Sequence, residues 1–289
     1  MTEKFLLMNA VAKTTKTGNT YFDLTLSNRE EKIAGKYWSG SPDLTEFVGS
    51  VLEISGSRDE FNGEAQFKVQ SFEVTGEDPS QFCKASKYDI EQMYAGIMKL
   101  VDSCQNEELR GILTDVFEEY GEEFKKHSAA LKVHHAFVGG LLQHTFCVAT
   151  AASRLCSVYP GADRDVVVTA ALLHDIGKLD ELSTFPTLEY TRLGNCVGHT
   201  TLSVMLVSKY VGRITDSLVR DKLLNCIASH HGRLEWGAPV VPACVEACIV
   251  HVSDLLDSRV EIITEASENL ETGKMSGYLN TIGGAVIGV

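Results

Sequence analysis

Proline and positive charge are both scarce in this chain of 289 residues. Six prolines and 24 glycines are too few for a collagen-like chain or a Pro/Gly-rich stalk. Lysine and arginine number 26 against 39 acidic residues, and the resulting net charge of −13 argues against a protein that grips nucleic acid by bulk charge. The hydrophobic share of 44% and the charged share of 22% are those of ordinary globular proteins, which excludes a disordered or coiled-coil chain.

Cysteine pairs at metal-site spacing are also absent. None of the eight cysteines forms a C-x-x-C pair, so we expect neither a zinc ribbon nor a thioredoxin-like motif. We expect the cysteines to be small buried side chains in a reducing compartment. The apolar run near Met1 is too short for a signal peptide, and residues 166–173 are too few to span a bilayer. The expectation is a cytoplasmic protein without membrane contact.

The hydrophobic pattern changes near residue 80. Before it, apolar and polar residues alternate in short runs, such as residues 21–26, 51–55 and 65–69, with turn signals between them. About five such strands predict a small β-barrel of the OB type, with residues 41–47 as a short helix between strands three and four. We expect residues 77–80 to form a linker. Beyond them apolar residues recur every three or four positions, which predicts helices over 88–103, 107–126, 141–158, 165–173, 200–211, 218–229 and 243–266.

These patterns predict an α+β multidomain protein. We assign residues 1–80 to an OB-like nucleic-acid-binding barrel, 81–130 to a linker and helical lead-in, and 131–289 to an all-α domain that carries the chemistry.

Histidine next to acid or glycine is the chemical feature of the helical region. In chain order the motifs are Gln143-His144-Thr145, His174-Asp175-Ile176-Gly177-Lys178, Gly198-His199-Thr200, His230-His231-Gly232 and His251-Val252-Ser253-Asp254-Leu255-Leu256-Asp257. Imidazole and carboxylate together suit manganese, iron, zinc or cobalt, whereas carboxylates alone would suit magnesium. Several of these residues lie on otherwise apolar helices, where a bound metal would cancel the cost of burying an ionisable group. Gly177 lets the backbone turn at a helix end, so Lys178 can point its ammonium at a substrate anion.

The ordered set H…HD…D resembles the signature of the HD-domain metallophosphohydrolases, with its four positions at His144, His174, Asp175 and Asp254. Three further histidines resemble the extended pattern of HD proteins that bind two metals: His199, His230 and His231. The N-terminal barrel and the run HHAFVGGLLQHT at 134–145 make nearly the whole chain look like the YhaM-type 3′–5′ exoribonucleases.

The resemblance implies two divalent metal ions, with manganese as the first choice and iron, cobalt or zinc as alternatives. His144, His174, Asp175 and Asp254 would hold the first, and Asp175 would bridge to a second at His199, His230 and His231. Water activated there would attack phosphorus in line while Lys178 steadies the phosphoryl oxygens. Asp257 would orient that water or a ligand histidine, and an ordinary surface carboxylate is an equal alternative.

The expected substrate contacts lie in two places. His134 and His135 precede a helix and are candidates for a phosphate contact, with capping or packing as the alternative. His251 is expected to pack in the core. In the barrel, single-strand binding would use stacking and charge from Tyr21, Tyr37, Trp38 and Lys36. Residues 1–80 carry 8 basic and 13 acidic residues, a net −5, so RNA binding by the barrel is mainly implied by the resemblance.

The expected function is metal-dependent 3′–5′ hydrolysis of single-stranded RNA to nucleoside monophosphates. DNA is a second candidate substrate, and a homo-oligomer stays open. The alternatives are an HD phosphodiesterase or phosphatase acting on a small nucleotide, and a non-catalytic nucleic-acid-binding protein with a structural metal. A barrel is unnecessary for the first alternative, and structural zinc sites are usually closed and cysteine-rich, which counts against the second.

Overall fold

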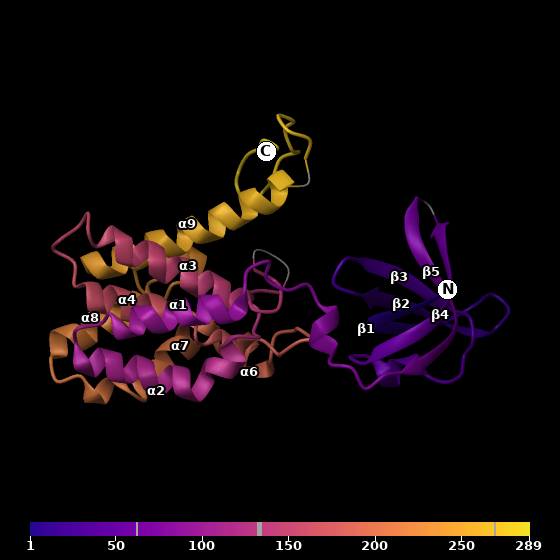
Figure 1. Ribbon diagram of the computed structural model, residues 1–289, viewed down its shortest axis with the longest axis horizontal. Coiled ribbons are helices and arrows are strands. Elements are labelled where there is room, and N and C mark those ends of the chain that lie inside the picture. The colour runs from indigo at the N-terminus through magenta and orange to yellow at the C-terminus, as the bar shows by residue number, and fades with distance from the viewer. Residues whose placement is uncertain (62, 132–134, 269) are drawn as a thin grey trace. The chain divides into compact units, whose positions relative to one another are not determined.

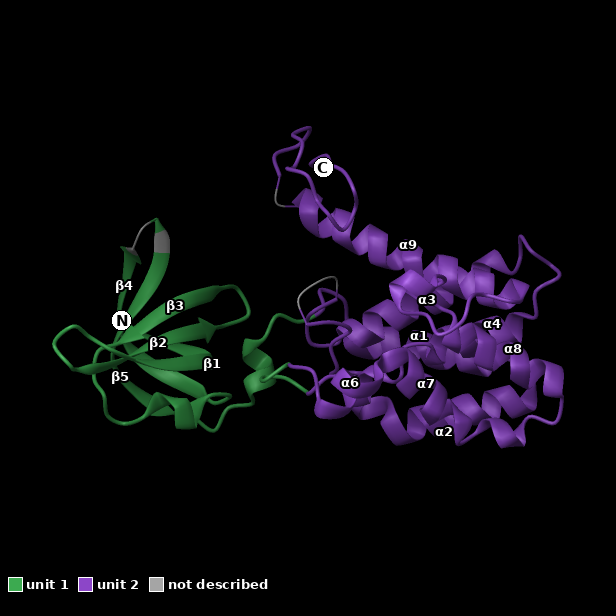
Figure 2. Ribbon diagram, turned by 180° about the vertical axis from the view of Figure 1, so that it is seen from behind, with its two compact units in different colours: residues 1–85, 184–188 green, residues 86–183, 189–289 purple. Residues whose placement is uncertain are grey.

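The computed structural model describes residues 1–61, 63–131, 135–268 and 270–289 (Figure 1). The chain divides into two compact units, Met1–Ala85 with Thr184–Leu188 and Ser86–Ser183 with Glu189–Val289 (Figure 2). The first unit is a β-barrel and the second is helical, which confirms the predicted α+β fold class.

The barrel closes from five strands in the order β1-β2-β3-β5-β4. The strands are β1 (Thr2–Thr14), β2 (Thr20–Ser27), β3 (Lys32–Tyr37), β4 (Val51–Phe61) and β5 (Glu64–Val74). The long β1 pairs with β4 through its first half and with β2 through its second half, and β3 pairs with β5 in parallel. The short helix expected between strands three and four is the 3₁₀ turn η1 (Leu44–Phe47).

Alternate residues of each strand point into the barrel, because successive side chains of a strand face opposite sides. Phe22, Leu24 and Leu26 of β2 are buried between less buried neighbours, and Phe5 and Phe67 meet edge to face with ring centres 5.7 Å apart. The period-two pattern of the sequence is thus the pattern of this core.

Nine α-helices build the described part of the second unit: α1 (Ile90–Asp102), α2 (Glu107–Phe124), α3 (Gly140–Leu155), α4 (Arg164–Leu173), α5 (Lys178–Glu181), α6 (Arg192–Val197), α7 (His199–Ser208), α8 (Ser217–Ala228) and α9 (Val245–Glu268). Five of them start at a residue whose side chain accepts hydrogen bonds from first-turn amides: Asp89, Asn106, Asp163, Thr191 and Asp216.

Helix α4 lies at the centre of this unit. Every residue from Val166 to Leu173 is buried, and α4 contacts α1, α2, α3, α8 and α9. A helix that is apolar on all sides is stable only when other elements surround it. Because α4 ends in the middle of the bundle, His174 and Asp175, the next two residues, are placed in the interior.

Helices α1 and α2 contribute to the same hydrophobic core as α3 and α4, through residues such as Ile97 and Val116. The short helices α5 and α6 were not expected from the sequence. Among the described residues, no helix combines the length and apolar character needed to cross a membrane.

Candidate active site

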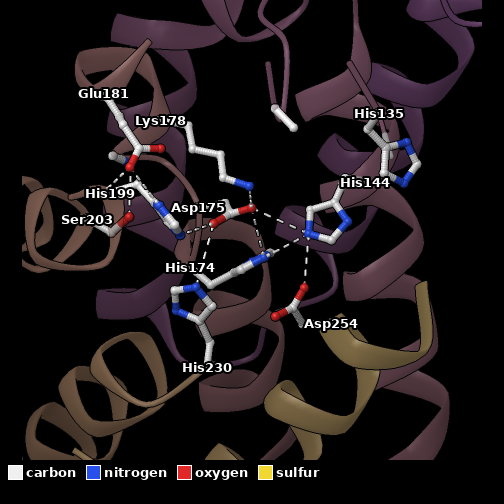
Figure 3. Close-up of polar contacts among 12 residues, drawn as sticks. His135, His144, His174, Asp175, Lys178, Glu181, His199, Ser203, His230 and Asp254 are labelled. Atoms are coloured by element: carbon white, nitrogen blue, oxygen red, sulfur yellow. Dashed lines mark hydrogen bonds and ion pairs between the residues drawn. The ribbon is translucent and has the colours of Figure 1, made fainter. Parts of the chain in front are cut away.

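Five segments of the helical unit bring their polar side chains to one place (Figure 3). His144 lies in the first turns of α3, His174 and Asp175 follow α4, His199 begins α7, His230 and His231 follow α8, and Asp254 lies on α9. These are the seven residues that the H…HD…H…HH…D pattern selected.

The first group surrounds the Nε2 atom of His144. This atom lies 3.2 Å from His174 Nε2 and 3.2 Å from Asp254 Oδ1. Asp175 Oδ2 lies 3.4 Å from His144 Nε2 and 3.5 Å from His174 Nε2. Four potential metal-ligand atoms therefore face one another.

The second group forms on the other oxygen of Asp175. Asp175 Oδ1 lies 3.4 Å from His199 Nε2 and 3.6 Å from His230 Nε2. His231 Nε2 is 3.2 Å from His199 Nε2. One carboxylate thus divides its two oxygens between two sets of imidazole nitrogens, which is the arrangement a bridging ligand requires.

The outer nitrogen of each histidine has a hydrogen-bond acceptor. Three of them donate an Nδ1 hydrogen to a main-chain carbonyl oxygen: His174 to Ala171 at 2.8 Å, His230 to Ile227 at 2.7 Å and His231 to Trp236 at 2.9 Å. A carbonyl oxygen only accepts, so Nδ1 carries a proton in these rings and Nε2 is the nitrogen directed into the site. His144 and His199 instead bond through Nδ1 to Asp257 (2.7 Å) and Glu181 (3.0 Å). Such outer contacts orient metal-ligating histidines.

Two buried atoms of the site form no hydrogen bond within the described residues. They are Asp175 Oδ1 and His230 Nε2. Leaving a buried acceptor without a partner costs roughly 1–3 kcal/mol, and more for a charged group. A divalent cation between them would satisfy both lone pairs, so the residues fit the metal ions that the sequence pattern implies.

The electrostatics of the site also favour added positive charge. Burial opposes ionisation of Asp175, but Lys178, His174 and His199 hold its pKa well below the ordinary value. Burial lowers the pKa of His144, yet hydrogen bonds to Asp254 and Asp257 raise it to about 10. A place that stabilises a protonated imidazole so strongly also stabilises a metal cation.

Lys178 lies inside the site rather than at its rim. Its Nζ is 2.7 Å from Asp175 Oδ2, and its side chain is mostly buried. Burial lowers the pKa of Lys178, but the charge and hydrogen bond of Asp175, together with the charges of Asp254 and Glu181, outweigh burial and raise it. A Cβ on Gly177 would lie 2.4 Å from the carbonyl oxygen of His199, so only glycine allows α7 to approach this closely.

Asp257 lies behind His144. Its Oδ2 accepts from His144 Nδ1 at 2.7 Å and contacts His135 Nε2 at 2.8 Å. Asp257 thus meets the edge of the imidazole opposite Nε2, a position suited to orienting the ligand histidine. The buried His135 shares this outer position, away from the carboxylate of Asp175. His134, the other candidate phosphate contact, lies outside the described residues.

We expect Asp257→Asn to weaken metal binding about 10- to 100-fold, because the amide cannot supply the negative charge that holds the His144 imidazole in position. Titration of metal-free protein with Mn²⁺ measures this change. Glu118→Gln on α2, a change of an exposed acid outside the site, is the control. An unchanged Mn²⁺ affinity in Asp257→Asn would show that the contact between Asp257 and His144 does not support metal binding.

A cavity of about 230 Å³ opens onto both groups. It is lined by His144, Asp175, Lys178, His231, Trp236, His251, Asp254, Leu255 and Ser258. His251, expected in the core, therefore reaches the site, and its Nδ1 donates to the carbonyl of His230 at 2.7 Å. The spacing of His251 three residues before Asp254 was the available signal. Trp236 and Glu181 were missed, although Glu181 lies only three residues after Lys178 in the motif.

The aromatic residues expected on the barrel separate into two sets. Trp38 is 56% exposed and stacks on Tyr21, with ring centres 4.8 Å apart and planes 23° from parallel. Lys36 Nζ lies 5.0 Å from the centre of Tyr21 and 5.6 Å from that of Trp38. Tyr37 does not join them: it is only 8% exposed and packs in the barrel core, because it ends β3 on the opposite face from Lys36.

Comparison with known proteins matches the HD domain to residues 141–259, a range that contains every histidine and aspartate of both groups. HD domains are metal-dependent phosphohydrolases, so the site depends on divalent metal. Among solved structures, the second OB-fold domain of replication protein A from Methanococcus maripaludis covers 27% of this chain and 84% of its own, with 19% identity and a TM-score of 0.22. The barrel topology described above rests on its own strand order.

The 3′–5′ exoribonuclease YhaM of Geobacillus sp. (strain WCH70) is 30% identical over 282 residues, which are 94% of this chain and 86% of that protein. YhaM of Listeria welshimeri is 29% identical over 95% of this chain and 90% of its own. YhaM of Bacillus velezensis is 28% identical over 93% and 88%. With this coverage, two units and the HD motif in place, the chain belongs to the family of the YhaM 3′–5′ exoribonucleases.

Proposed function

We propose that this protein removes nucleoside monophosphates from the 3′ end of single-stranded RNA, using two divalent metal ions of which manganese is the first choice. The observation that carries the proposal is the Asp175 carboxylate, divided between two histidine groups beside Lys178 in a cavity of about 230 Å³. Membership of the YhaM family supports the 3′-to-5′ direction of degradation and RNA as the substrate.

The proposed ligands fall into two sets that share one carboxylate. His144, His174, Asp175 and Asp254 would hold one ion, and Asp175 with His199, His230 and His231 would hold the other. Histidine-rich sets of this kind suit manganese, iron, cobalt or zinc better than magnesium. Divalent ions at these positions supply Lewis-acid activation of water and neutralise charge on the reacting phosphate.

The remaining side chains act on the substrate and on the ligands. The Lys178 ammonium is proposed to bind a non-bridging phosphoryl oxygen, where a charge-assisted hydrogen bond stabilises the charge that develops during cleavage. Asp257 and Glu181 would keep the Nε2 atoms of His144 and His199 directed into the site.

The barrel offers a place to hold the strand. Tyr21 and Trp38 form an aromatic platform with the Lys36 ammonium, which also pairs with Asp23 at 2.8 Å, next to it. Exposed aromatic rings beside a cation bind single-stranded nucleic acid by stacking and phosphate contact. This platform supports a polymeric substrate over a small nucleotide.

Incubation with three substrates tests the function. We expect 5′-labelled single-stranded RNA to shorten stepwise from its 3′ end with release of nucleoside monophosphates, and duplex RNA and a cyclic dinucleotide to react far more slowly. A chelator should abolish the reaction, and Mn²⁺ should restore it. Faster turnover of the cyclic dinucleotide would favour an HD phosphodiesterase for small nucleotides.

For the barrel we expect Trp38→Ala to raise KM on a long single strand about 5- to 100-fold, since stacking contributes roughly 1–3 kcal/mol per base. The kcat value and the turnover of a dinucleotide should stay the same. Val11→Ala, at another exposed position of the barrel, is the control. Equal KM values for Trp38→Ala and the unaltered protein would show that the aromatic platform of the barrel does not bind the substrate.

A further inference from the structure

An exposed tryptophan lines the cavity that the two ligand groups share. Trp236 is 42% exposed and borders the same space as Asp175, Lys178 and Asp254. Burying an aromatic side chain of this size would stabilise the fold, so an indole that stays in contact with water at a reactive centre invites a functional explanation.

The main chain around Trp236 is tied to the histidine pair. The Trp236 carbonyl accepts the Nδ1 hydrogen of His231 at 2.9 Å. Gly232, with φ of +79°, lets the chain turn directly against His251, because a Cβ there would lie 2.2 Å from that ring. Trp236 then ends the 3₁₀ turn η4 (Leu234–Trp236). The residue whose carbonyl sets the tautomer of His231 therefore also places an indole at the site.

A positive charge accompanies the ring. The guanidinium carbon of Arg233 lies 4.7 Å from the centre of the Trp236 ring, a cation–π contact. The Arg233 side chain is well exposed and forms a loose ion pair with the exposed Glu235 at 3.8 Å, which leaves it accessible to a phosphate. The His251 ring is 6.2 Å from the Trp236 ring at 47°. An exposed aromatic face with a cation beside it is the combination by which proteins hold a base and its phosphate without sequence preference.

We propose that Trp236 stacks on the base of the 3′-terminal nucleotide and so positions its phosphodiester at Asp175 and Lys178. This inference rests on the proposed function and names the part of the substrate that the site recognises. A cavity of about 230 Å³ is smaller than the roughly 300–1,000 Å³ of sites that enclose a whole small ligand, which suits one nucleotide at the end of a chain. Because every base has an aromatic face, the contact sets the position of the strand end for any sequence.

A double-mutant cycle between enzyme and substrate tests the contact. The substrates are two oligoribonucleotides that differ only in whether the 3′-terminal residue has its base. On the complete substrate, Trp236→Ala should raise KM for the first cleavage about 10- to 100-fold with little change in kcat, and Trp236→Phe should restore most of the loss. On the substrate that lacks the base, the KM values of the unaltered enzyme and of Trp236→Ala should differ by less than about threefold, because the stacking interaction is already absent.

The proposal would be overturned if removal of the indole and removal of the base raised KM additively. It would also be overturned if the unaltered enzyme and Trp236→Ala had equal KM values on the complete substrate. Mn²⁺ content per chain should stay the same in Trp236→Ala, since the carbonyl that bonds His231 belongs to the main chain. Tyr159→Ala, which removes another exposed aromatic ring outside the cavity lining, is the control and should leave every value unchanged.

Fluorescence tests the same contact without turnover. The chain has two tryptophans, so Trp38→Phe leaves Trp236 as the sole indole. At a fixed Mn²⁺ concentration, adenosine 5′-monophosphate should change Trp236 emission saturably and ribose 5-phosphate should not. Equal responses to both, or no response to the nucleotide, would contradict base stacking. Failure of the unaltered enzyme to shorten RNA would instead contradict the proposed function, while this titration would still decide on stacking.

Discussion

Asp175→Asn should lower kcat/KM on single-stranded RNA by at least about a thousandfold. The substitution keeps the shape of the side chain but removes the charge that both histidine groups share. If both ions depend on this carboxylate, Mn²⁺ content per chain should fall as well, and with it the activation of water and the neutralisation of the phosphate.

Two measurements accompany this variant. Circular dichroism should be unchanged, because the fold of the bundle depends on the apolar residues of α4 and its neighbours. Asp221→Asn on α8, an exposed acid outside the site, should behave like the unaltered protein. Full Mn²⁺ content together with normal turnover in Asp175→Asn would refute the assignment of Asp175 as the shared ligand.

Lys178→Ala should reduce kcat about a hundredfold while Mn²⁺ content stays the same. Loss of one charge-assisted contact in the transition state costs roughly 2–3 kcal/mol, and each 1.4 kcal/mol is about a factor of ten in rate. Because Lys178 Nζ lies 2.7 Å from Asp175 Oδ2, the alternative is that the lysine mainly organises the ligand.

Metal content separates these two roles of Lys178. A drop in both Mn²⁺ content and rate would show that Lys178 mainly holds Asp175 in place for the metal, and our assignment of a substrate contact would be wrong. Lys178→Arg, which keeps the charge with a different geometry, should recover part of the rate. Lys209→Ala, at an exposed lysine after α7, should change neither quantity.

The fold could be predicted where one physical pattern decides the outcome. Alternation in β2 reflects a barrel with a single core, and the unbroken apolar run of α4 reflects burial on every side. The helices α5 and α6 are too short, at 4 and 6 residues, to show a period, and both pack against α7. They depend on this packing and cannot be read from local spacing.

For the candidate site, the order of the motifs indicated which residues would meet but not how they would meet. Adjacent His174 and Asp175 predicted two ligands, whereas the division of the Asp175 oxygens depends on the approach of α7 to Gly177. Asp257 could be read either as a surface acid or as a partner of a histidine, and only the contact with His144 decides between them. Tyr37 was misplaced because it was grouped with the aromatic residues Tyr21 and Trp38, although the alternation of β3 puts it on the same inward face as Ile33.

The seven proposed ligands come from five segments that are distant in the chain, beginning at α3 and ending at α9. An unfolded chain cannot bring them together, so a cation held by them binds the native state alone and acts as a reversible cross-link of the bundle. At a metal concentration a hundred times the dissociation constant, such binding adds about 2.7 kcal/mol to the free energy of unfolding. That is a large part of the roughly 5–15 kcal/mol that usually separates folded from unfolded domains. Metal supply would then set not only the rate of the enzyme but also how long each molecule survives in its folded form.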